Sequence, residues 1–212
     1  MKLYIANKNY SSWSFRPFIA MKAKGVAFEE ELVPFDDESG NPKFREFSPT
    51  GKVPVLVHGE VRIWESLAIL EYLADAFPAL GFWPSETGAR AHARSVSAEM
   101  HAGFMALRSQ CPMNLRRPVS AIEVSDAARA DVARIEAIWD ECLARSGGPF
   151  LFGEFCNADA MYAPVVNRLE TYALSGHPAV VAYTAAMKAL PAWREWERAA
   201  LDEPWIVPSD EV

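Results

Sequence analysis

The first third of the chain alternates short apolar runs with one stretch of helical spacing. Residues 3–6 form an apolar run of strand length, and residues 31–35 form a second candidate strand. Between them, residues 15–24 have helical spacing, and Gly25 follows where the helix should end. A helix between two strands favours a right-handed βαβ unit, in which the strands run parallel.

A polar stretch, DDESGNPKFREFSPTG (residues 36–51), comes next and leaves room for one short helix. Residues 53–57 and 61–64 have the composition of strands on either side of an HGE turn, which predicts an antiparallel hairpin. Residues 65–76 then have helical spacing. The predicted order is βαβ followed by ββα.

The remainder of the chain has helical spacing and no strand pattern. PALGFWPSETG (residues 78–88) has the composition of a linker. Helices are predicted after it at residues 89–108, 126–145 with Ser125 as the cap, 158–172, and 179–201 with a break at Pro191. We therefore expect an α/β domain over residues 1–77, a linker over 78–88 and an all-helical domain over 89–212.

Composition and charge narrow the function classes. Half of the 212 residues are hydrophobic, which is enough for a sizeable core, but no apolar run reaches the roughly 18 residues of a membrane span. The first residues lack the apolar stretch of a signal peptide, so we expect a cytoplasmic protein. The net charge of -7 argues against nucleic-acid binding, which needs clustered Lys and Arg.

The cysteines and histidines predict neither disulfides nor a metal site. Cys111, Cys142 and Cys156 are odd in number and widely spaced, as free thiols of a reducing compartment are. The four histidines do not stand at metal-ligand spacing with them.

The stretch NYSSWSFRP (residues 9–17) falls at a predicted strand-to-helix turn, a place where many enzymes keep their chemistry. It carries three serines and neither cysteine nor histidine. If Ser14 is the N-cap, Pro17 falls at the third helical position, where its missing N–H has no cost. Ser11 and Ser12 would then lie just ahead of the helix.

Two further motifs suggest a site for a peptide-like ligand. In GKVPVL, Pro54 stands where a strand begins, and a cis Val53–Pro54 bond would expose the Val53 backbone to such a ligand. An ordinary trans proline at a strand edge is the alternative. In WES, Ser66 is placed to cap a helix whose N-terminus suits a carboxylate, while Glu65 could bind an ammonium. Ser66 as a simple cap is the alternative there.

Four segments of the chain together resemble the cytosolic glutathione transferases. The segments are SSWSFRPFIAMKAKG, GKVPVL, WESLAILEYL and FGEFCNADAMYAPV, and their order and spacing match over residues 1–205. The resemblance implies a thioredoxin-like N-terminal domain with the glutathione site, an all-helical C-terminal domain that lines the second-substrate pocket, and a homodimer. It implies that Val53, beside a cis Pro54, pairs with the cysteinyl part of glutathione. Glu65 and Ser66 would hold the γ-glutamyl end, and Lys52 would reach towards the glycyl carboxylate.

Within this family, the serine turn takes on a chemical role. Thiol-disulfide enzymes of thioredoxin type carry cysteines at this turn, so here the reactive sulfur must come from the ligand. A hydroxyl that donates a hydrogen bond to sulfur stabilises the thiolate over the thiol. The SSxSxR pattern is most similar to the zeta class and related bacterial serine-type enzymes, which implies Ser11 as the catalytic residue, with Ser12 as the alternative. Ser14 is read as a cap and Arg16 as structural.

Two departures from the family pattern stand out. Trp13 replaces the cysteine that the zeta-class maleylacetoacetate isomerases carry, which weakens the case for isomerase activity. Cys156 replaces the usual Ser or Thr cap of a helix, although Asp159 could still accept the Cys156 backbone N–H. Cys156 as a reactive thiol is the less favoured interpretation.

The first helices after the linker should supply the acceptor pocket. The candidates are His101, Phe104, Met105, Arg108, Met113, Asn114, Arg116 and Arg117. Arg116 and Arg117 could bind the carboxylate of an acidic substrate, or they could be solvated. The expected function is a transferase that activates glutathione, with no metal, for attack on a hydrophobic or small acidic electrophile. A glutathione-dependent isomerase or peroxidase, and a non-catalytic ligand-binding or scaffold module, are the alternatives.

Overall fold

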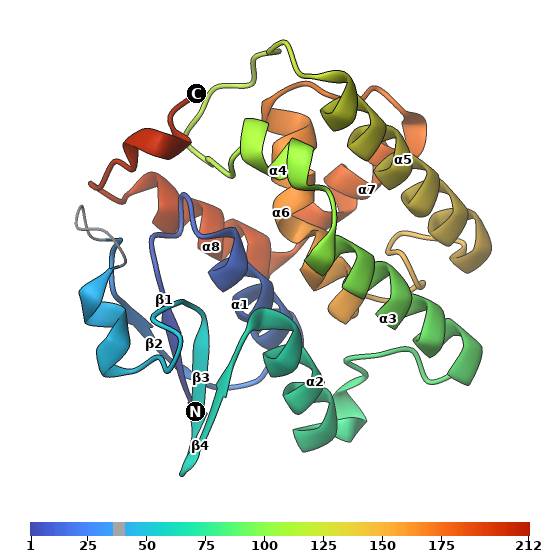
Figure 1. The fold of residues 1–212 in the computed structure, drawn as a ribbon. Coiled ribbons are helices and arrows are strands. Elements are labelled where there is room, and N and C mark those ends of the chain that lie inside the picture. The colour runs from blue at the N-terminus through green and yellow to red at the C-terminus, as the bar shows by residue number, and fades with distance from the viewer. Residues whose placement is uncertain (36–40) are drawn as a thin grey trace.

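The structure, a computed structural model, describes residues 1–35 and 41–212. A small sheet with two helices forms one side of the molecule, and helices make up the rest (Figure 1). Part of the polar stretch at residues 36–51 thus lies outside the described residues. Its remainder contains one short 3-10 helix, η1 (Pro42–Glu46), as the composition allowed.

The sheet has four strands in the order β2-β1-β3-β4. They are β1 (Lys2–Ile5), β2 (Glu29–Leu32), β3 (Val55–His58) and β4 (Val61–Trp64). β1 pairs in parallel with β2 and antiparallel with β3, and β3 and β4 form a hairpin. The predicted βαβ unit and hairpin are confirmed, although β2 and β3 are each shifted by about two residues from the predicted ranges.

The helix after β1 begins earlier than predicted. α1 spans Ser12–Ala23, and its N-cap is Ser11 rather than Ser14. The reason is that the Ser14 hydroxyl accepts the backbone N–H of Ala6 at 3.2 Å, so it is tied to the preceding strand instead of to the amides of its own helix. Pro17 consequently lies inside α1 and not at its third position.

The second helix of the sheet unit is α2 (Ser66–Ala76), followed by the short η2 (Pro78–Leu80). The helices that follow are α3 (Thr87–Ala102), α4 (Met105–Gln110), α5 (Asp126–Ser146), α6 (Asn157–Thr171), α7 (Pro178–Ala189) and α8 (Pro191–Leu201). The Ser125 cap is confirmed, because its side chain accepts the N–H of Ala128. Within residues 1–35 and 41–212, no helix has both the length and the apolar composition needed to cross a membrane.

One predicted helix, over residues 89–108, is two helices in the structure. It breaks at Gly103 and Phe104, and Phe104 has a left-handed backbone with φ of 56°. A Cβ atom at Gly103 would lie 2.7 Å from the carbonyl oxygen of Glu99, so only glycine fits this close approach without a shift of the backbone. The break turns α4 away from α3, towards α5.

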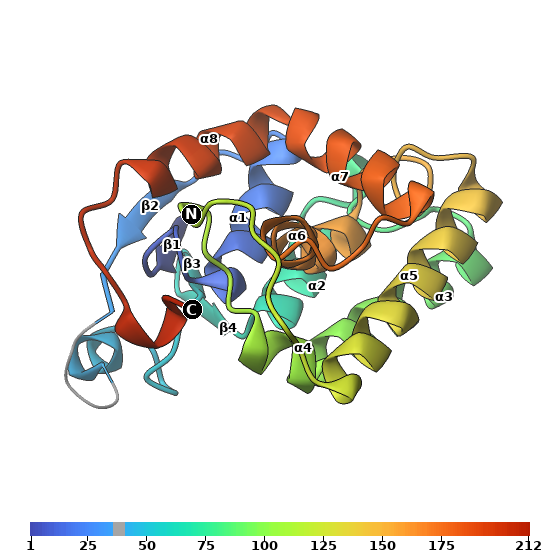
Figure 2. The same cartoon turned by 90° about the horizontal axis from the view of Figure 1, so that it is seen from above.

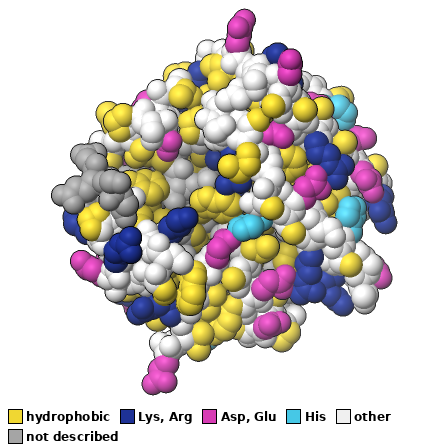
Figure 3. Space-filling view, viewed as in Figure 1, with side chains coloured by type: hydrophobic (Ala, Val, Ile, Leu, Met, Phe, Trp, Pro, Cys, Tyr) yellow, Lys and Arg dark blue, Asp and Glu magenta, His cyan; other side chains and the backbone are white. Residues whose placement is uncertain are grey.

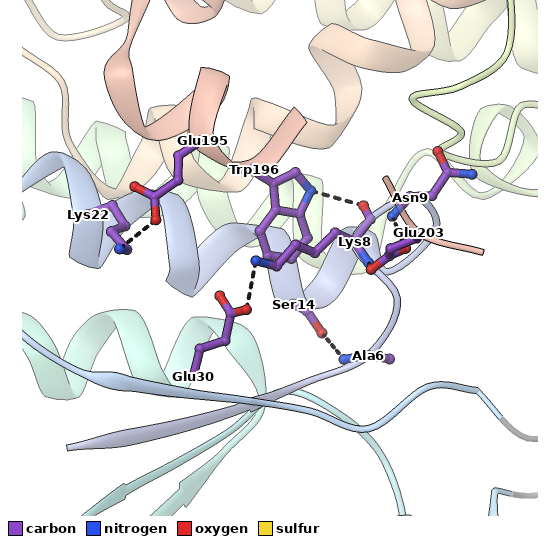
Figure 4. A network of polar contacts seen from close by, with 9 residues as sticks. All are labelled: Ala6, Lys8, Asn9, Ser14, Lys22, Glu30, Glu195, Trp196 and Glu203. Atoms are coloured by element: carbon purple, nitrogen blue, oxygen red, sulfur yellow. Dashed lines mark hydrogen bonds and ion pairs between the residues drawn. The ribbon is translucent and has the colours of Figure 1, made fainter. Parts of the chain in front are cut away.

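The larger of two apolar clusters among the described residues joins the sheet unit to the helices. α6 is buried along almost its whole length and packs against α1 and α3. α8 returns to cover α1 (Figure 2). Between these two helices, Phe15 stacks on Trp196 with ring centroids 4.9 Å apart. The Trp196 indole N–H donates to the Lys8 carbonyl oxygen at 2.9 Å, and Lys22 pairs with Glu195 at 2.6 Å (Figure 4). The loop after β1 is therefore held from the far end of the chain.

The N-terminus of α6 is capped from within the core, as predicted. Asp159 accepts the Cys156 backbone N–H at 2.8 Å, and it also accepts the Leu151 N–H and the Tyr183 hydroxyl. The buried aspartate thus fixes three segments with one side chain.

Candidate active site

Three adjoining cavities of about 470, 260 and 200 Å³ form a cleft. The two larger cavities lie between the sheet unit and helices α3 and α4, whereas residues of the sheet unit alone line the smallest. Trp13 lines all three cavities. Several residues each line two of them, among them Ser12, Lys52, Val53 and Arg108. On the face shown in Figure 3, apolar side chains line a hollow whose rim carries basic, acidic and histidine side chains. The cleft is therefore amphipathic.

The Val53–Pro54 peptide bond is cis, as the resemblance implied. The pair precedes β3, and both residues line the largest cavity together with Lys52. The Val53 backbone therefore stands at the wall of a ligand-sized space, and its pairing with a cysteinyl group remains a prediction.

Glu65 and Ser66 stand at the start of α2, with a difference from the sequence prediction. Glu65 is the N-cap residue, and Ser66 is the first helical residue and fully buried. The Ser66 hydroxyl donates to Glu65 Oε1 at 2.9 Å, while His101 Nε2 lies 2.6 Å from Glu65 Oε2. Glu65 has a left-handed φ of 76°, a conformation that costs about 1–3 kcal/mol and is found mainly at functional sites.

The serine turn presents its three hydroxyls differently. Ser11 is buried except for a 4% exposed fraction, and its Oγ lies 2.7 Å from Ser14 Oγ. Ser11 lines the 200 Å³ cavity, whereas the half-buried Ser12 lines that cavity and the 260 Å³ one. Ser14 is fully buried and lines none of the three. Ser11 and Ser12 both remain candidates for the sulfur contact.

Trp13 is sandwiched by two guanidinium groups. The Arg16 and Arg108 guanidinium carbons lie 4.1 and 4.8 Å from its ring centroid, and the His101 ring meets its edge at 5.3 Å. Trp13 therefore lies where the three cavities adjoin.

Arg16 has the structural role that the sequence suggested. Its Nε donates to the carbonyl oxygen of Met161 at 3.0 Å and its Nη1 to that of Ser12 at 2.9 Å, which ties the first turn of α1 to α6. Burial, reinforced by the neighbouring Arg168 and Arg108, lowers the pKa of Arg16 well below its usual value.

The main site residue that the sequence interpretation missed is Arg168. Its Nε donates to the Cys111 carbonyl oxygen at 2.8 Å, but its buried Nη1 finds no partner among the described residues. Burial lowers the pKa of Arg168 to about 10, which leaves it charged at neutral pH. The sequence did offer one indication of this role. Arg168 comes three residues after Val165, and this spacing places it on the apolar face of α6.

The predicted pocket residues divide into two groups. His101 lines the largest cavity, Met105 and Met113 line the 260 Å³ cavity, and Arg108 lines both. Asn114 is buried outside the cavities, where its side-chain oxygen accepts the backbone N–H groups of Arg116 and Arg117. Phe104 is buried in the core, next to the break between α3 and α4.

Arg116 and Arg117 also lie outside the three cavities, and they are not simply solvated either. Arg116 donates to the carbonyl oxygens of Glu203 and Trp205, both at 2.6 Å. Arg117 donates to the carbonyl oxygen of Val212 at 2.8 Å. These contacts span about 90 residues of sequence, so both arginines hold residues 203–212, and neither lines a cavity of the cleft.

Within the described ranges, no group of three or more His, Cys, Asp or Glu side chains is placed to hold a metal ion. The three cysteines are free and buried. Burial raises the pKa of Cys111 and Cys142 to about 11 and that of Cys156 well above its usual value.

Comparisons with known proteins agree with this geometry. Residues 10–76 match the N-terminal domain of glutathione S-transferases, and residues 122–199 match their C-terminal domain.

A probable maleylacetoacetate isomerase of Caenorhabditis elegans is 28% identical over 86% of this chain and 87% of its own length. A glutathione transferase homologue from Burkholderia, solved with bound glutathione, is 27% identical over 95% of this chain and 98% of that one, with a TM-score of 0.73. A bacterial zeta-class maleyl pyruvate isomerase shares the fold at 24% identity, 96% and 99% coverage and a TM-score of 0.72. The chain belongs to the glutathione S-transferase family.

Proposed function

We propose that the protein is a glutathione transferase in which a serine hydroxyl of the α1 turn activates the glutathione thiol. The observation that carries the proposal is the convergence around Trp13. The cis Val53–Pro54 pair and the serine turn come from the sheet unit, and Arg108 comes from the helices, yet all border adjoining cavities. Family members solved with bound glutathione, from Burkholderia and a sphingomonad, support it.

Glutathione would lie along the largest cavity. The carboxylate of Glu65 would take the γ-glutamyl ammonium, and the N-terminus of α2 at Ser66 would take the γ-glutamyl carboxylate. The Val53 backbone would pair with the cysteinyl residue, and Lys52 would reach the glycyl end. Because Ser66 and His101 now hold both oxygens of Glu65, glutathione would share or displace these contacts.

This placement directs the sulfur towards the serine turn. A free thiol has a pKa of about 8.5, so little thiolate exists at neutral pH. A hydrogen bond from Ser11, together with the positive end of the α1 dipole, stabilises the thiolate. The thiolate then attacks the electrophilic atom of the second substrate and displaces its leaving group.

The second substrate would occupy the 260 Å³ cavity. Apolar side chains of Trp13, Met105 and Met113 suit a hydrophobic body. Arg108 and Arg168 line the same cavity, and the unpartnered Nη1 of Arg168 suits an anionic group. A small acidic electrophile fits both features.

A glutathione-dependent isomerase is the second candidate. The same two arginines favour an acidic substrate, and relatives in Caenorhabditis elegans and Vibrio cholerae are described as probable maleylacetoacetate isomerases. In that case the thiolate adds to the substrate and leaves again, so glutathione is not consumed. Following glutathione consumption during turnover separates the two reactions.

We extend the proposal to a homodimer. Its support is the open edge of the sheet at β4, where Val61 is 49% exposed. Sedimentation at micromolar concentration should find twice the 23.6 kDa mass of one chain, and a species of the single-chain mass alone would argue against it.

Mixing the protein with glutathione tests the central claim. Thiolates absorb at about 240 nm, so glutathione binding at pH 7 should produce a difference absorbance at this wavelength. S-methyl glutathione has no ionisable thiol and should not produce it. Glutathione binding without this absorbance would favour a ligand-binding module. No binding at all would reject the proposal.

A further inference from the structure

The C-terminal segment, defined here as residues 203–212, folds back onto the serine turn. The carboxylate of Glu203 accepts the backbone N–H groups of Lys8 and Asn9 at 2.6 and 3.1 Å (Figure 4). Arg116 holds the same segment through the carbonyl oxygens of Glu203 and Trp205. The segment is therefore fixed beside the turn that carries Ser11 and Ser12.

Further contacts fix the far end of the C-terminal segment. The Tyr10 hydroxyl contacts the Glu211 carboxylate, and Arg117 Nε donates to the Val212 carbonyl oxygen at 2.8 Å. Asn114 Nδ2 donates to the backbone carbonyl of Asp210 at 3.4 Å. Asp210 is thus positioned by its backbone, and its side chain lines the 260 Å³ cavity.

Asp210 faces the basic groups of that cavity. Arg168 and Arg108 line the same space, and the Nη1 atom of Arg168 is buried without a partner. Arg168 and Asp210, both described residues, form no ion pair, but because both line this cavity their opposite charges act on the same space. Burial raises the pKa of Asp210, while the field of Arg168 acts in the opposite direction.

We infer that Asp210 is a specificity-determining residue: its carboxylate offsets the charge of Arg168 and so lowers the affinity of the second-substrate cavity for anionic substrates relative to neutral ones of the same shape. The inference rests on the proposed function, since it concerns the second substrate. An anion that approaches Arg168 also approaches Asp210, so part of the attraction is cancelled by repulsion. A neutral molecule experiences neither effect to first order.

Substitution of Asp210 by Asn tests this charge effect with little change of shape. The Asn114 contact is made to the backbone of residue 210, so it does not depend on the carboxylate. The two substrates share a chlorobenzene ring with nitro groups on both sides of the chlorine, and they carry either a carboxylate or a neutral carboxamide para to the chlorine. In Asp210→Asn the KM for the carboxylate substrate should fall by about three- to tenfold. The reason is that the repulsion between the partly buried Asp210 carboxylate and the substrate carboxylate is removed. The KM for the neutral substrate should change by less than about twofold.

Two further variants separate charge from structure. Asp210→Glu keeps the charge and should behave as the wild type does. Asp140→Asn removes an exposed charge on α5, outside the cavities, and should change neither KM. The inference is overturned if Asp210→Asn alters both KM values equally, alters neither, or raises the KM of the carboxylate substrate.

A binding measurement keeps the inference testable even if the proposed transferase activity fails. Should the wild type turn over neither ring, titration with nitrobenzoate and with nitrobenzamide still reports the cavity. Tighter nitrobenzoate binding in Asp210→Asn, with nitrobenzamide binding unchanged, supports the role of Asp210. Equal binding of nitrobenzoate to both proteins rejects it.

Discussion

The hydroxyl groups of Ser11 and Ser14 lie 2.7 Å apart, and the Ser14 oxygen also accepts the backbone N–H of Ala6 at 3.2 Å. Because Ala6 supplies a donor to Ser14, the Ser14 proton can be donated to the Ser11 oxygen. The Ser11 proton is then available to the cavity that Ser11 lines. A residue that lies outside the cavities thus orients one that borders them.

The first prediction concerns the pKa of bound glutathione. Removal of a hydrogen bond to a charged acceptor costs about 1.5–3 kcal/mol, so Ser11→Ala should raise the pKa of the bound thiol by about one to two units. Turnover should therefore fall near neutral pH and partly recover at alkaline pH, where the thiol ionises without help. Absorbance titration of the complex near about 240 nm measures this pKa.

Ser12→Ala and Ser14→Ala are the variants to compare with Ser11→Ala. Ser14→Ala leaves the buried N–H of Ala6 without its partner, so it should lower the free energy of unfolding by about 1–3 kcal/mol. A pKa shift in Ser12→Ala alone would move the assignment by one residue. If none of the three variants shifts the pKa, a serine hydroxyl does not hold the thiolate.

The second prediction concerns glutathione affinity. Ser66→Ala should weaken glutathione binding by about 1–3 kcal/mol, because a hydrogen bond to a charged group is lost. The Ser66 hydroxyl also orients Glu65, so both ends of the γ-glutamyl site are affected. Calorimetry measures the affinity, and Ser95→Ala, at an exposed position on α3, is the control. Unchanged affinity in a folded Ser66→Ala protein would reject this placement of the γ-glutamyl group.

The sequence predicted the features of the fold that depend on local pattern. Apolar runs and helical spacing predicted the element order βαβ-ββα and most of the helices, and the hydrogen bond from the Cys156 backbone N–H to Asp159 was also predicted. The N-terminus of α1 was placed too late, because Ser14 satisfies Ala6 in the neighbouring strand. The break of α3 at Gly103 was missed, because it depends on a close approach to the Glu99 carbonyl.

The site was predictable where a motif carries it and not where distant segments meet. Short motifs predicted Val53, Glu65 and Ser12 as site residues, and all three line the cleft. Arg117 was placed in the pocket because nothing local reveals its contact with Val212, 95 residues away. Arg168 was missed for the same reason, since its place at the cavity depends on a contact with Cys111, 57 residues away in the sequence.

The third prediction concerns the cysteines. The pKa of Cys111 and Cys142 is raised to about 11 by burial, so only about one thiol in a thousand is ionised at pH 8. A thiol reagent should therefore leave the native protein unlabelled at this pH and should label all three cysteines after denaturation. Rapid labelling of Cys156 in the native state would instead identify it as a reactive thiol.

The last prediction concerns Asp159, which is fully buried and accepts hydrogen bonds from Leu151, Cys156 and Tyr183. Asp159→Ala leaves three buried donors without an acceptor and should lower the free energy of unfolding by about 3–5 kcal/mol. Asp159→Asn keeps one acceptor oxygen and should lower it by less.

The pH dependence of this stability distinguishes the charge of Asp159 from its hydrogen bonds. Burial is the largest influence and raises the pKa of Asp159 in the folded state, although the three hydrogen bonds act in the opposite direction. A carboxyl group with a raised folded-state pKa contributes most stability below its unfolded pKa, and that contribution is lost as pH rises through the folded pKa. Asn does not titrate, so the stability advantage of the wild type over Asp159→Asn should narrow as pH rises through this window and then stay constant. Urea unfolding of both proteins at a series of pH values measures the difference. An advantage that widens with rising pH would mean that the hydrogen bonds outweigh burial and that the folded-state pKa is lowered.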